Sequence, residues 1–330
     1  MTIAVYGAGG IGCYVGGRLA AGGANVVFIG RQRLADELAE HGLRLTDYLG
    51  ADLVVPAVRY ETTPEAAAEA DLVLVTVKSA GTATAADELA KVLKPGAVVI
   101  SFQNGIRNGE GLQERLPDHT VLTGMVPFNV LNRGGGTFHQ GTEGGLDVQK
   151  DAALGPYEDA FERAGLPLKQ HAEILPVQWA KLLLNLNNPV NALSDLPLRD
   201  ELAQRDYRRC LAAAQTETLD LLKAAGITPA QLTALPAHRI PSVLRLPDFL
   251  FKRLASKMLA VDPLARSSMW EDLQAGRRTE IDYLNGEVVR LAESLGREAP
   301  VNAKLVALIR AAESGETAAI PGPKLLSLLT

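Results

Sequence analysis

The stretch from Thr2 to Gly12, Thr-Ile-Ala-Val-Tyr-Gly-Ala-Gly-Gly-Ile-Gly, joins a short apolar run to regularly spaced glycines. Residues 3–6 predict a buried strand, and the small apolar residues 13–21 predict a helix packed closely on a sheet. The glycines at positions 7, 9 and 12 have the G-x-G-x-x-G spacing of a dinucleotide-binding turn. In such a turn, the first glycine permits a tight bend, the second admits a pyrophosphate, and the third lets the helix approach the strand.

The start of the helix after this turn is a favourable place for phosphates. Its first N–H groups have no acceptor within the helix, and they lie at the positive end of the helix dipole. Glycine-rich turns also close ordinary parallel sheets, but here the strand and the helix both accompany the glycines. We therefore predict a cofactor-binding loop made of Gly7, Ala8, Gly9, Gly10, Ile11 and Gly12.

Composition is that of a globular protein. The chain has 330 residues, of which 47% are hydrophobic and 22% charged, so it is long enough for two domains. Its net charge of −5 at pH 7 provides no basic field for nucleic acid or an anionic membrane. No basic segment precedes the N-terminal apolar run, and glycines interrupt that run, so we expect no membrane span and a cytoplasmic location.

Cysteine and histidine usage excludes two further classes of site. The two cysteines, Cys13 and Cys210, are too few for a disulfide framework and are typical of a reducing compartment. The five histidines are scattered, with no paired spacing of the kind that metal sites use. We therefore expect no metal.

The second predicted strand, residues 25–30, ends at Arg31 rather than at an acidic residue. An NAD-specific site usually places Asp or Glu there to bind the ribose 2′-hydroxyl, whereas a guanidinium matches a 2′-phosphate. Arg31 thus favours NADP(H) over NAD. The alternative interpretation is a basic first turn of a surface helix.

Two more polar residues follow predicted parallel strands. Lys78 follows the strand at 71–77, and Asn104 follows the strand at 97–102. Ligands of open α/β sheets bind outside the carboxyl ends of the strands, so both residues are candidates for the cofactor site. A strand-ending lysine also occurs by chance, and Asn104-Gly105 is first of all a turn signal.

The remaining pattern of the first half predicts further strands. Residues 42–60 suggest a hairpin inserted in the doubly wound order, and residues 121–148 suggest antiparallel additions at the far side of the sheet. Pro127 argues against a central strand there. A helix at 157–164 and a strand at 166–169 precede a change to helical periodicity. The predicted fold is α/β, with a Rossmann-type doubly wound sheet over residues 1–170 and an all-helical domain over residues 171–330.

A helix predicted at 176–188 carries polar residues in an otherwise apolar segment. Lys181, Asn185 and Asn188 lie at positions i, i+4 and i+7 and share one face. Unpaired burial costs about 1–3 kcal/mol per polar group, so these groups must emerge at solvent or converge on polar partners. Burial shifts the pKa of a lysine toward neutral pH, which is the condition for proton donation. The alternative is an amphipathic helix with a solvated stripe, for which Asn is a poor choice.

Beyond this helix, we expect helices over 200–225 and 229–233 and in the 239–260 region. A polar cluster at 265–273 is expected to open a helix that ends near Gly276, and residues 277–286 to begin another. Thr279 followed by Asp282 is also consistent with a helix cap. Pro300 is expected to start the last helix, and residues 320–323 to lead into a short tail.

The chain resembles the ketopantoate reductase family over nearly its full length. The resemblance is carried by the glycine turn, by Trp179-Ala180-Lys181, and above all by Ser267-Ser268-Met269 followed by Thr279-Glu280-Ile281-Asp282-Tyr283. It implies a Rossmann-type domain followed by a helical domain, and reduction of a 2-keto acid by NADPH, with ketopantoate to (R)-pantoate in pantothenate biosynthesis the leading reaction.

The resemblance also implies roles for single residues. Lys181 matches the general acid that protonates the keto oxygen, and Glu280 matches the acidic residue beside the substrate hydroxyl. Ser268 matches the ligand of the substrate carboxylate, and Asn185 a substrate-binding asparagine. On the cofactor side, Arg31 matches the 2′-phosphate ligand, and Lys78 and Asn104 match residues at the nicotinamide and ribose.

Three departures from the family pattern lie on the substrate side. Pro189 comes one residue early, so the second substrate asparagine is Asn188 or Asn187. Ala265 stands where the family has an asparagine, and Met125-Val126-Pro127-Phe128 replaces a Thr-Thr pair. Another branched or bulkier 2-keto acid is therefore an alternative substrate. A non-catalytic NADP-sensing protein is a second alternative, and leucine-rich surfaces of the helical half make a homodimer an open expectation.

Overall fold

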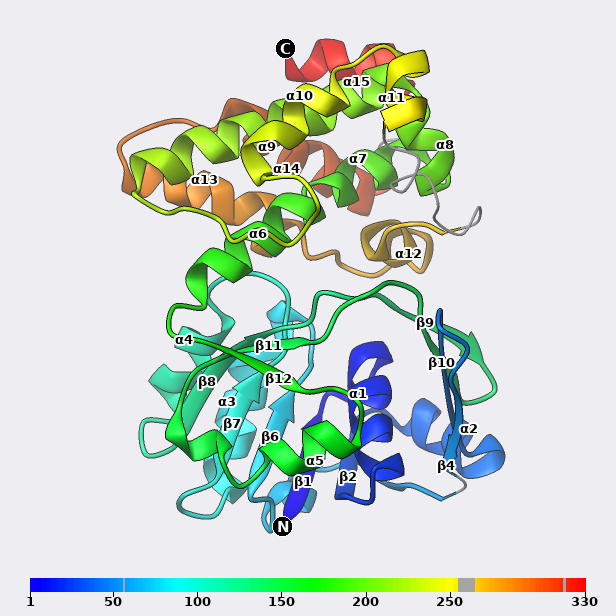
Figure 1. The fold of residues 1–330 in the computed structure, drawn as a ribbon, viewed down its shortest axis with the longest axis vertical. Helices are drawn as coiled ribbons and strands as arrows, with labels where there is room; N and C mark the ends of the chain where they lie inside the picture. Colours follow the sequence, from blue (N-terminus) through cyan, green and yellow to red (C-terminus); the bar gives the residue numbers. More distant parts are fainter. Residues whose placement is uncertain (56, 255–264, 317–318) are drawn as a thin grey trace. The chain divides into compact units, whose positions relative to one another are not determined.

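The computed structural model describes residues 1–55, 57–254, 265–316 and 319–330, which form two compact units. The first unit is Met1–Ile174 and the second is Leu175–Thr330 (Figure 1). The boundary predicted after residue 170 falls inside the last strand of the first unit, and the division by packing follows a few residues later.

The first unit alternates strands and helices. Its strands are β1 (Thr2–Tyr6), β2 (Asn25–Ile29), β3 (Leu43–Asp47), β4 (Asp52–Val55), β5 (Arg59–Glu61), β6 (Leu72–Val75), β7 (Val98–Ser101), β8 (Thr120–Met125), β9 (Val130–Gly134), β10 (Thr137–Gln140), β11 (Leu146–Gln149) and β12 (Leu168–His171). Its α-helices are α1 (Gly10–Ala21), α2 (Gln32–His41), α3 (Thr82–Val92), α4 (Asn108–Arg115) and α5 (Glu158–Arg163), with short 3-10 helices η1 (Pro64–Ala67), η2 (Ser79–Gly81) and η3 (Ala152–Leu154).

Eight of these strands form the main sheet, in the order β12-β11-β8-β7-β6-β1-β2-β5. The six strands from β8 to β5 are parallel, and the order of chain progression reverses at β1. This reversal is the topological switch point of a doubly wound sheet, where ligands bind outside the strand ends. The predicted fold class is thus confirmed, and the residues after β1 and β6 lie beside this point.

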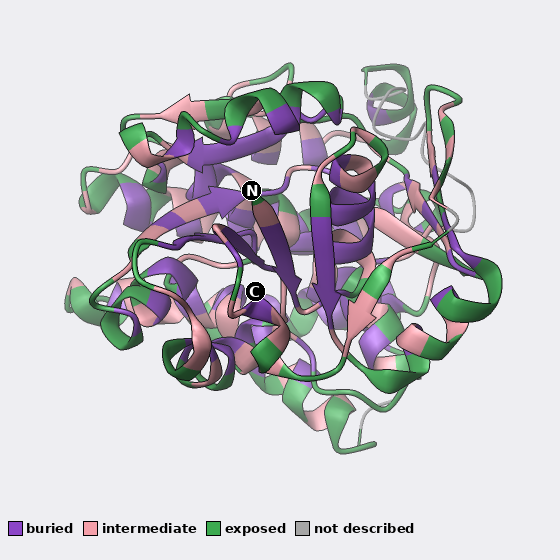
Figure 2. Cartoon of the chain, turned by 90° about the horizontal axis from the view of Figure 1, so that it is seen from below, coloured by how far each residue is buried: buried purple, intermediate pink, exposed green. Residues whose placement is uncertain are grey.

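Apolar residues cover both faces of the main sheet, as a doubly wound fold requires. In β1, Ile3 and Val5 belong to the cluster that includes α1, whereas Ala4 and Tyr6 belong to the cluster on α3 and α4. Figure 2 shows the central strands buried along most of their length.

A second sheet, in the order β4-β3-β10-β9, corrects two predictions. The hairpin expected within 42–60 is present as β3 and β4, but it lies in this sheet, while residues 59–61 extend the main sheet as β5. The leucines of β3 account for its position, because Leu43 and Leu45 pack directly on Gly17 of α1.

The strands within 121–148 were only partly predicted. Antiparallel pairing at the far side is correct for β11 on β8, but β8 itself runs parallel to β7, and β9 and β10 join the second sheet. The parallel course of β8 follows from the crossover helix α4, which the sequence analysis missed. Gly109 obscures its helical pattern, yet a Cβ there would lie 2.1 Å from Thr123 Oγ1 on β8. Pro127 lies between β8 and β9, outside both strands.

The described part of the second unit is helical. Its helices are α6 (Leu175–Asn185), α7 (Asn187–Ser194), α8 (Leu198–Leu202), α9 (Arg205–Ala224), α10 (Ile240–Leu244), α11 (Asp248–Leu254), α12 (Ser268–Gln274), α13 (Asn285–Ser294), α14 (Pro300–Glu313) and α15 (Gly322–Leu329), with 3-10 helices η4 (Ala237–Arg239) and η5 (Ile281–Tyr283). The helix predicted over 200–225 is divided between α8 and α9, and the helical region predicted at 239–260 is η4, α10 and α11 up to residue 254. Residues 255–260 of that prediction lie outside the described residues.

Two further predictions in this unit were wrong. Residues 229–233 form no helix, because the N–H of Ala230 donates to the carbonyl of Pro176 instead of starting a turn of its own. The expected C-terminal tail is the helix α15, which Pro323 favours at its first turn and which buries Leu325, Leu326 and Leu329.

The helix predicted over 176–188 is interrupted at Leu186, between α6 and α7. Pro189 explains the interruption, because it has no N–H to donate to the carbonyl of Asn185 four residues earlier. A membrane-spanning length of apolar helix is absent from the residues that the structure describes.

Candidate active site

The glycine turn joins β1 to α1 through a tight backbone. The N–H groups of Gly7 and Ala8 both donate to the carbonyl of Ile29, at 2.9 and 3.0 Å. Gly7 has a φ of +93°, a conformation that only glycine adopts readily. Its neighbours Gly10, Ile11 and Gly12 form the first turn of α1, which carries no acidic side chain.

The space around the glycines differs from one position to the next. A Cβ on Gly7 would lie 2.4 Å from Val77, and a Cβ on Gly12 would lie 2.5 Å from Thr76 Oγ1. Gly9 differs, because it is exposed and the nearest heavy atom to a Cβ there would be 3.8 Å away. The turn is therefore closed toward the protein and open at Gly9, a cradle that fits a pyrophosphate beside the helix N-terminus.

Arg31 directly follows β2 and is the residue before the first turn of α2. Its side chain is exposed, and the neighbouring Gln32 and Arg33 are exposed as well. Beneath them, the hydroxyl of Tyr60 donates to the carbonyl of Ala8 at 3.2 Å, which ties β5 to the glycine turn. No acidic residue ends β2, so this corner suits a phosphate better than a bare ribose hydroxyl.

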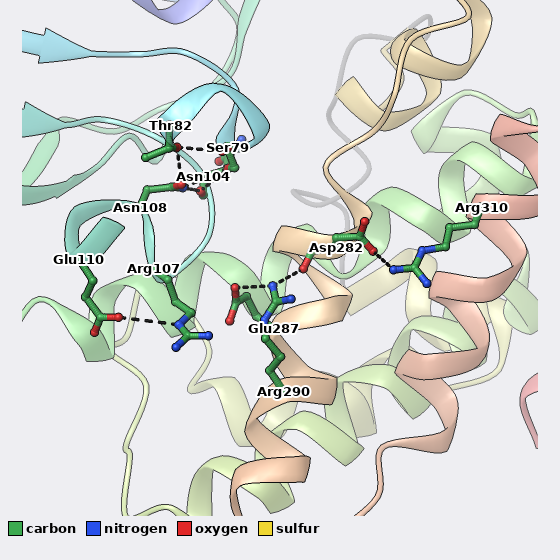
Figure 3. A network of polar contacts seen from close by, with 10 residues as sticks. All are labelled: Ser79, Thr82, Asn104, Arg107, Asn108, Glu110, Asp282, Glu287, Arg290 and Arg310. Carbon is green, nitrogen blue, oxygen red and sulfur yellow. Dashed lines mark hydrogen bonds and ion pairs between the residues drawn. The ribbon is translucent and has the colours of Figure 1, made fainter. Parts of the chain in front are cut away.

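Lys78 and Asn104 are both exposed, and a buried polar network joins the loops that carry them (Figure 3). The hydroxyl of Ser79 donates to the carbonyl of Asn104 at 3.0 Å. The carboxamide of Asn108 donates to the same carbonyl at 2.5 Å and to Ser79 Oγ at 3.0 Å, and it accepts from Thr82 Oγ1 at 2.7 Å.

Gln103 extends this network toward the sheet. Its carboxamide donates to the carbonyl of Val77 at 3.0 Å and to Thr82 Oγ1 at 2.8 Å, and it accepts from Ser101 at 2.9 Å. The sequence analysis missed these supporting residues. Asn108 lies four residues after Asn104, but that spacing alone does not distinguish it from a surface residue of α4.

In the second unit, Lys181, Asn185 and Asn188 are all half-buried, while Leu182 and Leu186 between them are buried. Despite the interruption at Leu186, the three polar residues thus belong to the less buried side of α6 and α7. Burial lowers the pKa of Lys181 from its usual 10.5 to about 8. A lysine with this pKa exchanges its proton near neutral pH.

The two neighbouring asparagines of α7 have different surroundings. Asn187 is buried, and its carboxamide donates to Oε2 of the fully buried Glu201 at 3.0 Å. Asn188 is half-buried, and its backbone carbonyl accepts from Ser267 Oγ at 3.3 Å. Of the pair, Asn188 is therefore the better candidate for a ligand-binding residue.

Ser268 is exposed at the first position of α12. Ser267 before it caps the helix, because its hydroxyl accepts from the N–H of Trp270 at 3.2 Å. The same hydroxyl contacts Asn188, so the structure brings the Ser268 segment and Asn188 together.

Glu280 lies on a separate segment, half-buried, immediately before η5. Just before this turn, Thr279 Oγ1 accepts from the N–H of Ile281 at 3.2 Å, but the N-cap residue is Glu280, so Thr279 and Asp282 do not form the predicted helix cap. Asp282 instead binds Arg310, with Nη2 2.6 Å from Oδ1, and its carbonyl accepts from Arg290 (Figure 3). These contacts stabilise the turn that presents Glu280.

Comparison with protein families gives a match over most of the chain. The family model described as ketopantoate reductase PanE/ApbA matches residues 3–152, and its C-terminal counterpart matches residues 173–313. The 2-dehydropantoate 2-reductase of Halobacterium salinarum is 32% identical over 324 residues, which cover 95% of this chain and 99% of that protein. The enzyme of the same name from Pyrococcus horikoshii is 30% identical over 321 residues, covering 95% and 98%.

Solved structures give the same result. A PanE/ApbA family ketopantoate reductase from Ralstonia eutropha JMP134 is 30% identical, with a TM-score of 0.82 and coverage of 96% of this chain and 99% of that one. D-mandelate dehydrogenase, solved with NADH and anilino(oxo)acetate, is 20% identical, with a TM-score of 0.78 and coverage of 96% and 99%. At 20% identity, this second likeness shows a shared fold and no more.

Proposed function

The chain belongs to the ketopantoate reductase family of nicotinamide-dependent oxidoreductases, and we propose that it reduces ketopantoate to (R)-pantoate with NADPH, in pantothenate biosynthesis. The observation that carries this proposal is Lys181, a lysine with a pKa of about 8 on the same helical side as Asn185 and Asn188. Residues 1–170 would bind the cofactor, and residues 171–330 would supply the substrate-binding and catalytic groups.

On the cofactor side, the proposal assigns the pyrophosphate to the open turn at Gly9 and the 2′-phosphate to Arg31. Lys78 and Asn104 bind the ribose and nicotinamide end, held in place by the buried network around Asn108. When bound, the cofactor supplies a hydride to the keto carbon.

On the substrate side, Lys181 acts as the general acid. Its ammonium donates a proton to the keto oxygen, which gains negative charge as the carbonyl is reduced. Glu280 binds near the resulting hydroxyl and helps to orient the lysine. Ser268 binds the substrate carboxylate, and Asn185 and Asn188 bind the rest of the substrate.

Ketopantoate remains the leading substrate although the family's Thr-Thr pair is replaced, because the replacing side chains are buried. Met125, Val126 and Phe128 are all buried, and the ring of Phe128 packs edge-on against Tyr14 at 5.8 Å. These side chains belong to the hydrophobic core of the first unit. Ala265 is a different case, because it offers only a methyl group where the family has an amide. A bulkier 2-keto acid is for that reason the second candidate.

A steady-state assay of NADPH oxidation with ketopantoate tests the proposal. We expect turnover by the wild type, and a loss of about 10²–10⁴-fold in kcat for Lys181→Ala, the range that one general acid contributes. Unchanged NADPH binding by that variant, measured by fluorescence titration, is the control. Absence of turnover with ketopantoate would refute this substrate, and turnover with a bulkier 2-keto acid would establish the second candidate.

A further inference from the structure

Among the described residues, three hydrogen bonds join the segment that leads into α12 to α7 and α8, and Arg266 of the same segment also pairs with Asp195 at the end of α7. The carbonyl of Ala265 accepts from the N–H of Leu198 at 2.8 Å, and the N–H of Ser267 donates to Oδ1 of Asn191 at 2.8 Å. The third bond joins Ser267 Oγ to the carbonyl of Asn188. The position of Ser268, the next residue, therefore depends on these attachments.

In two of these three hydrogen bonds the acceptor is a backbone carbonyl, and in the third it is the side chain of Asn191. Both the oxygen and the nitrogen of its carboxamide form hydrogen bonds. It is fully buried, and its Nδ2 donates to the carbonyl of Leu196 at 2.9 Å and to Oε2 of Glu201 at 3.1 Å. A rotated carboxamide would place an NH₂ group against the N–H of Ser267. The two acceptors on the Nδ2 side thus determine that Oδ1 faces Ser267.

Glu201 is itself an unusual residue for this position. It has no exposed surface, and its Oε2 accepts from both Asn187 and Asn191. Burial raises its pKa from 4.5 to about 8, so the side chain is mostly a neutral acid at pH 7. A buried carboxyl is costly unless it is hydrogen-bonded, and here Oε2 accepts from Asn191, the asparagine that holds Ser267, while Oε1 has no hydrogen-bond partner among the described residues.

We propose that Asn191, oriented by Glu201, is a positioning residue that sets the place of Ser268 relative to Asn188 and thereby the affinity for the 2-keto acid. This inference rests on the proposed function, in which Ser268 and Asn188 bind the substrate. Asn191 acts through the backbone of Ser267 and is not itself a substrate ligand.

The position of α12 can be followed without any substrate. Trp270 lies on α12, half-buried, with its Nε1 donating to Asp195 at 2.7 Å and the guanidinium of Arg266 over its ring. Because the chain has two tryptophans, Trp179→Phe leaves Trp270 as the only one. In that background, Asn191→Leu and Glu201→Leu are expected to shift the Trp270 emission and to increase its quenching by acrylamide.

Three variants separate this role from general destabilisation. Leu222→Ala removes a fully buried side chain of α9, so it lowers the melting temperature but should leave Trp270 quenching unchanged. Glu201→Gln keeps an oxygen that accepts from both carboxamides and should behave like the wild type. Glu201→Leu removes that acceptor and should behave like Asn191→Leu.

Steady-state kinetics then test whether the position of α12 affects substrate binding. Asn191→Leu should raise the KM for the keto acid by about five- to tenfold, the effect of losing one or two hydrogen bonds, with the KM for NADPH unchanged. Leu222→Ala should change neither KM. Unchanged Trp270 quenching in folded Asn191→Leu would overturn the proposal, as would an unchanged keto-acid KM. If the wild type reduced no 2-keto acid, the proposed function would fail, whereas the quenching experiment would still decide whether Asn191 positions α12.

Discussion

The carboxamide nitrogen of Asn108 lies 2.5 Å from the carbonyl oxygen of Asn104, and it also contacts Ser79, which follows Lys78. One buried side chain thus connects the loop after β7 with the turn after β6. We predict that Asn108→Ala raises the KM for NADPH and destabilises the fold by about 1–3 kcal/mol, because it leaves buried polar groups unpaired.

Ser79→Ala is the matched control for Asn108→Ala. It removes two of these hydrogen bonds but retains the contact between Asn108 and Asn104, so its effect on the NADPH KM should be smaller. Equal NADPH KM values for wild type and Asn108→Ala would contradict a positioning role for this network.

The glycine turn gives a prediction that separates folding from cofactor binding. Gly12→Ala should destabilise the fold by about 1–3 kcal/mol, because its Cβ would press on Thr76 and Val5. Gly9→Ala should retain the wild-type melting temperature but bind NADPH more weakly, since its methyl group enters the open cradle. Thermal unfolding and NADPH titration of both variants test this contrast, and tight NADPH binding by Gly9→Ala would refute the assigned phosphate position.

The position of Arg31 after β2 leads us to predict that it determines the preference for NADPH over NADH. Arg31→Ala should raise the KM for NADPH while leaving the KM for NADH unchanged, because only NADPH carries the 2′-phosphate. Arg33→Ala is a suitable control, since Arg33 already pairs with Glu37 at 3.4 Å on the surface of α2. An equal loss for both cofactors in Arg31→Ala would point to a role other than recognition of the 2′-phosphate.

Glu201 gives a prediction about stability and pH. Its pKa is raised from 4.5 to about 8 in the folded protein, so the folded state retains a proton that the unfolded state releases. The contribution of Glu201 to the free energy of unfolding is therefore complete below pH 4.5. It is lost as pH rises through about 8, and the loss is on the order of a few kcal/mol. Urea unfolding at several pH values should show this loss in the wild type and a flatter dependence in Glu201→Gln. The same pH dependence of the unfolding free energy in the wild type and in Glu201→Gln would contradict a protonated Glu201.

The sequence was most informative where neighbouring residues specify the structure. The strand, glycines and helix at the N-terminus form one local unit, and Lys181 stands out because it interrupts an apolar helix. Pairings between distant segments were harder to predict. The second sheet joins β3 to β10 across many residues, and α4 was missed because its glycine is required by contact with β8. The association of Asn191 with Glu201 and Ser267 has no local pattern at all, since each residue alone resembles an ordinary helix or cap residue.

The pH dependence of kcat for NADPH oxidation with ketopantoate tests the central claim most directly. A general acid must be protonated before reduction, and the pKa of Lys181 is lowered to about 8. We predict that kcat is constant at lower pH and falls as pH rises through about 8. In Lys181→Arg, whose guanidinium keeps its proton, kcat should be far lower and the decline near pH 8 absent. A decline near pH 8 that persists in Lys181→Arg, or a profile without any such decline in the wild type, would contradict Lys181 as the proton donor.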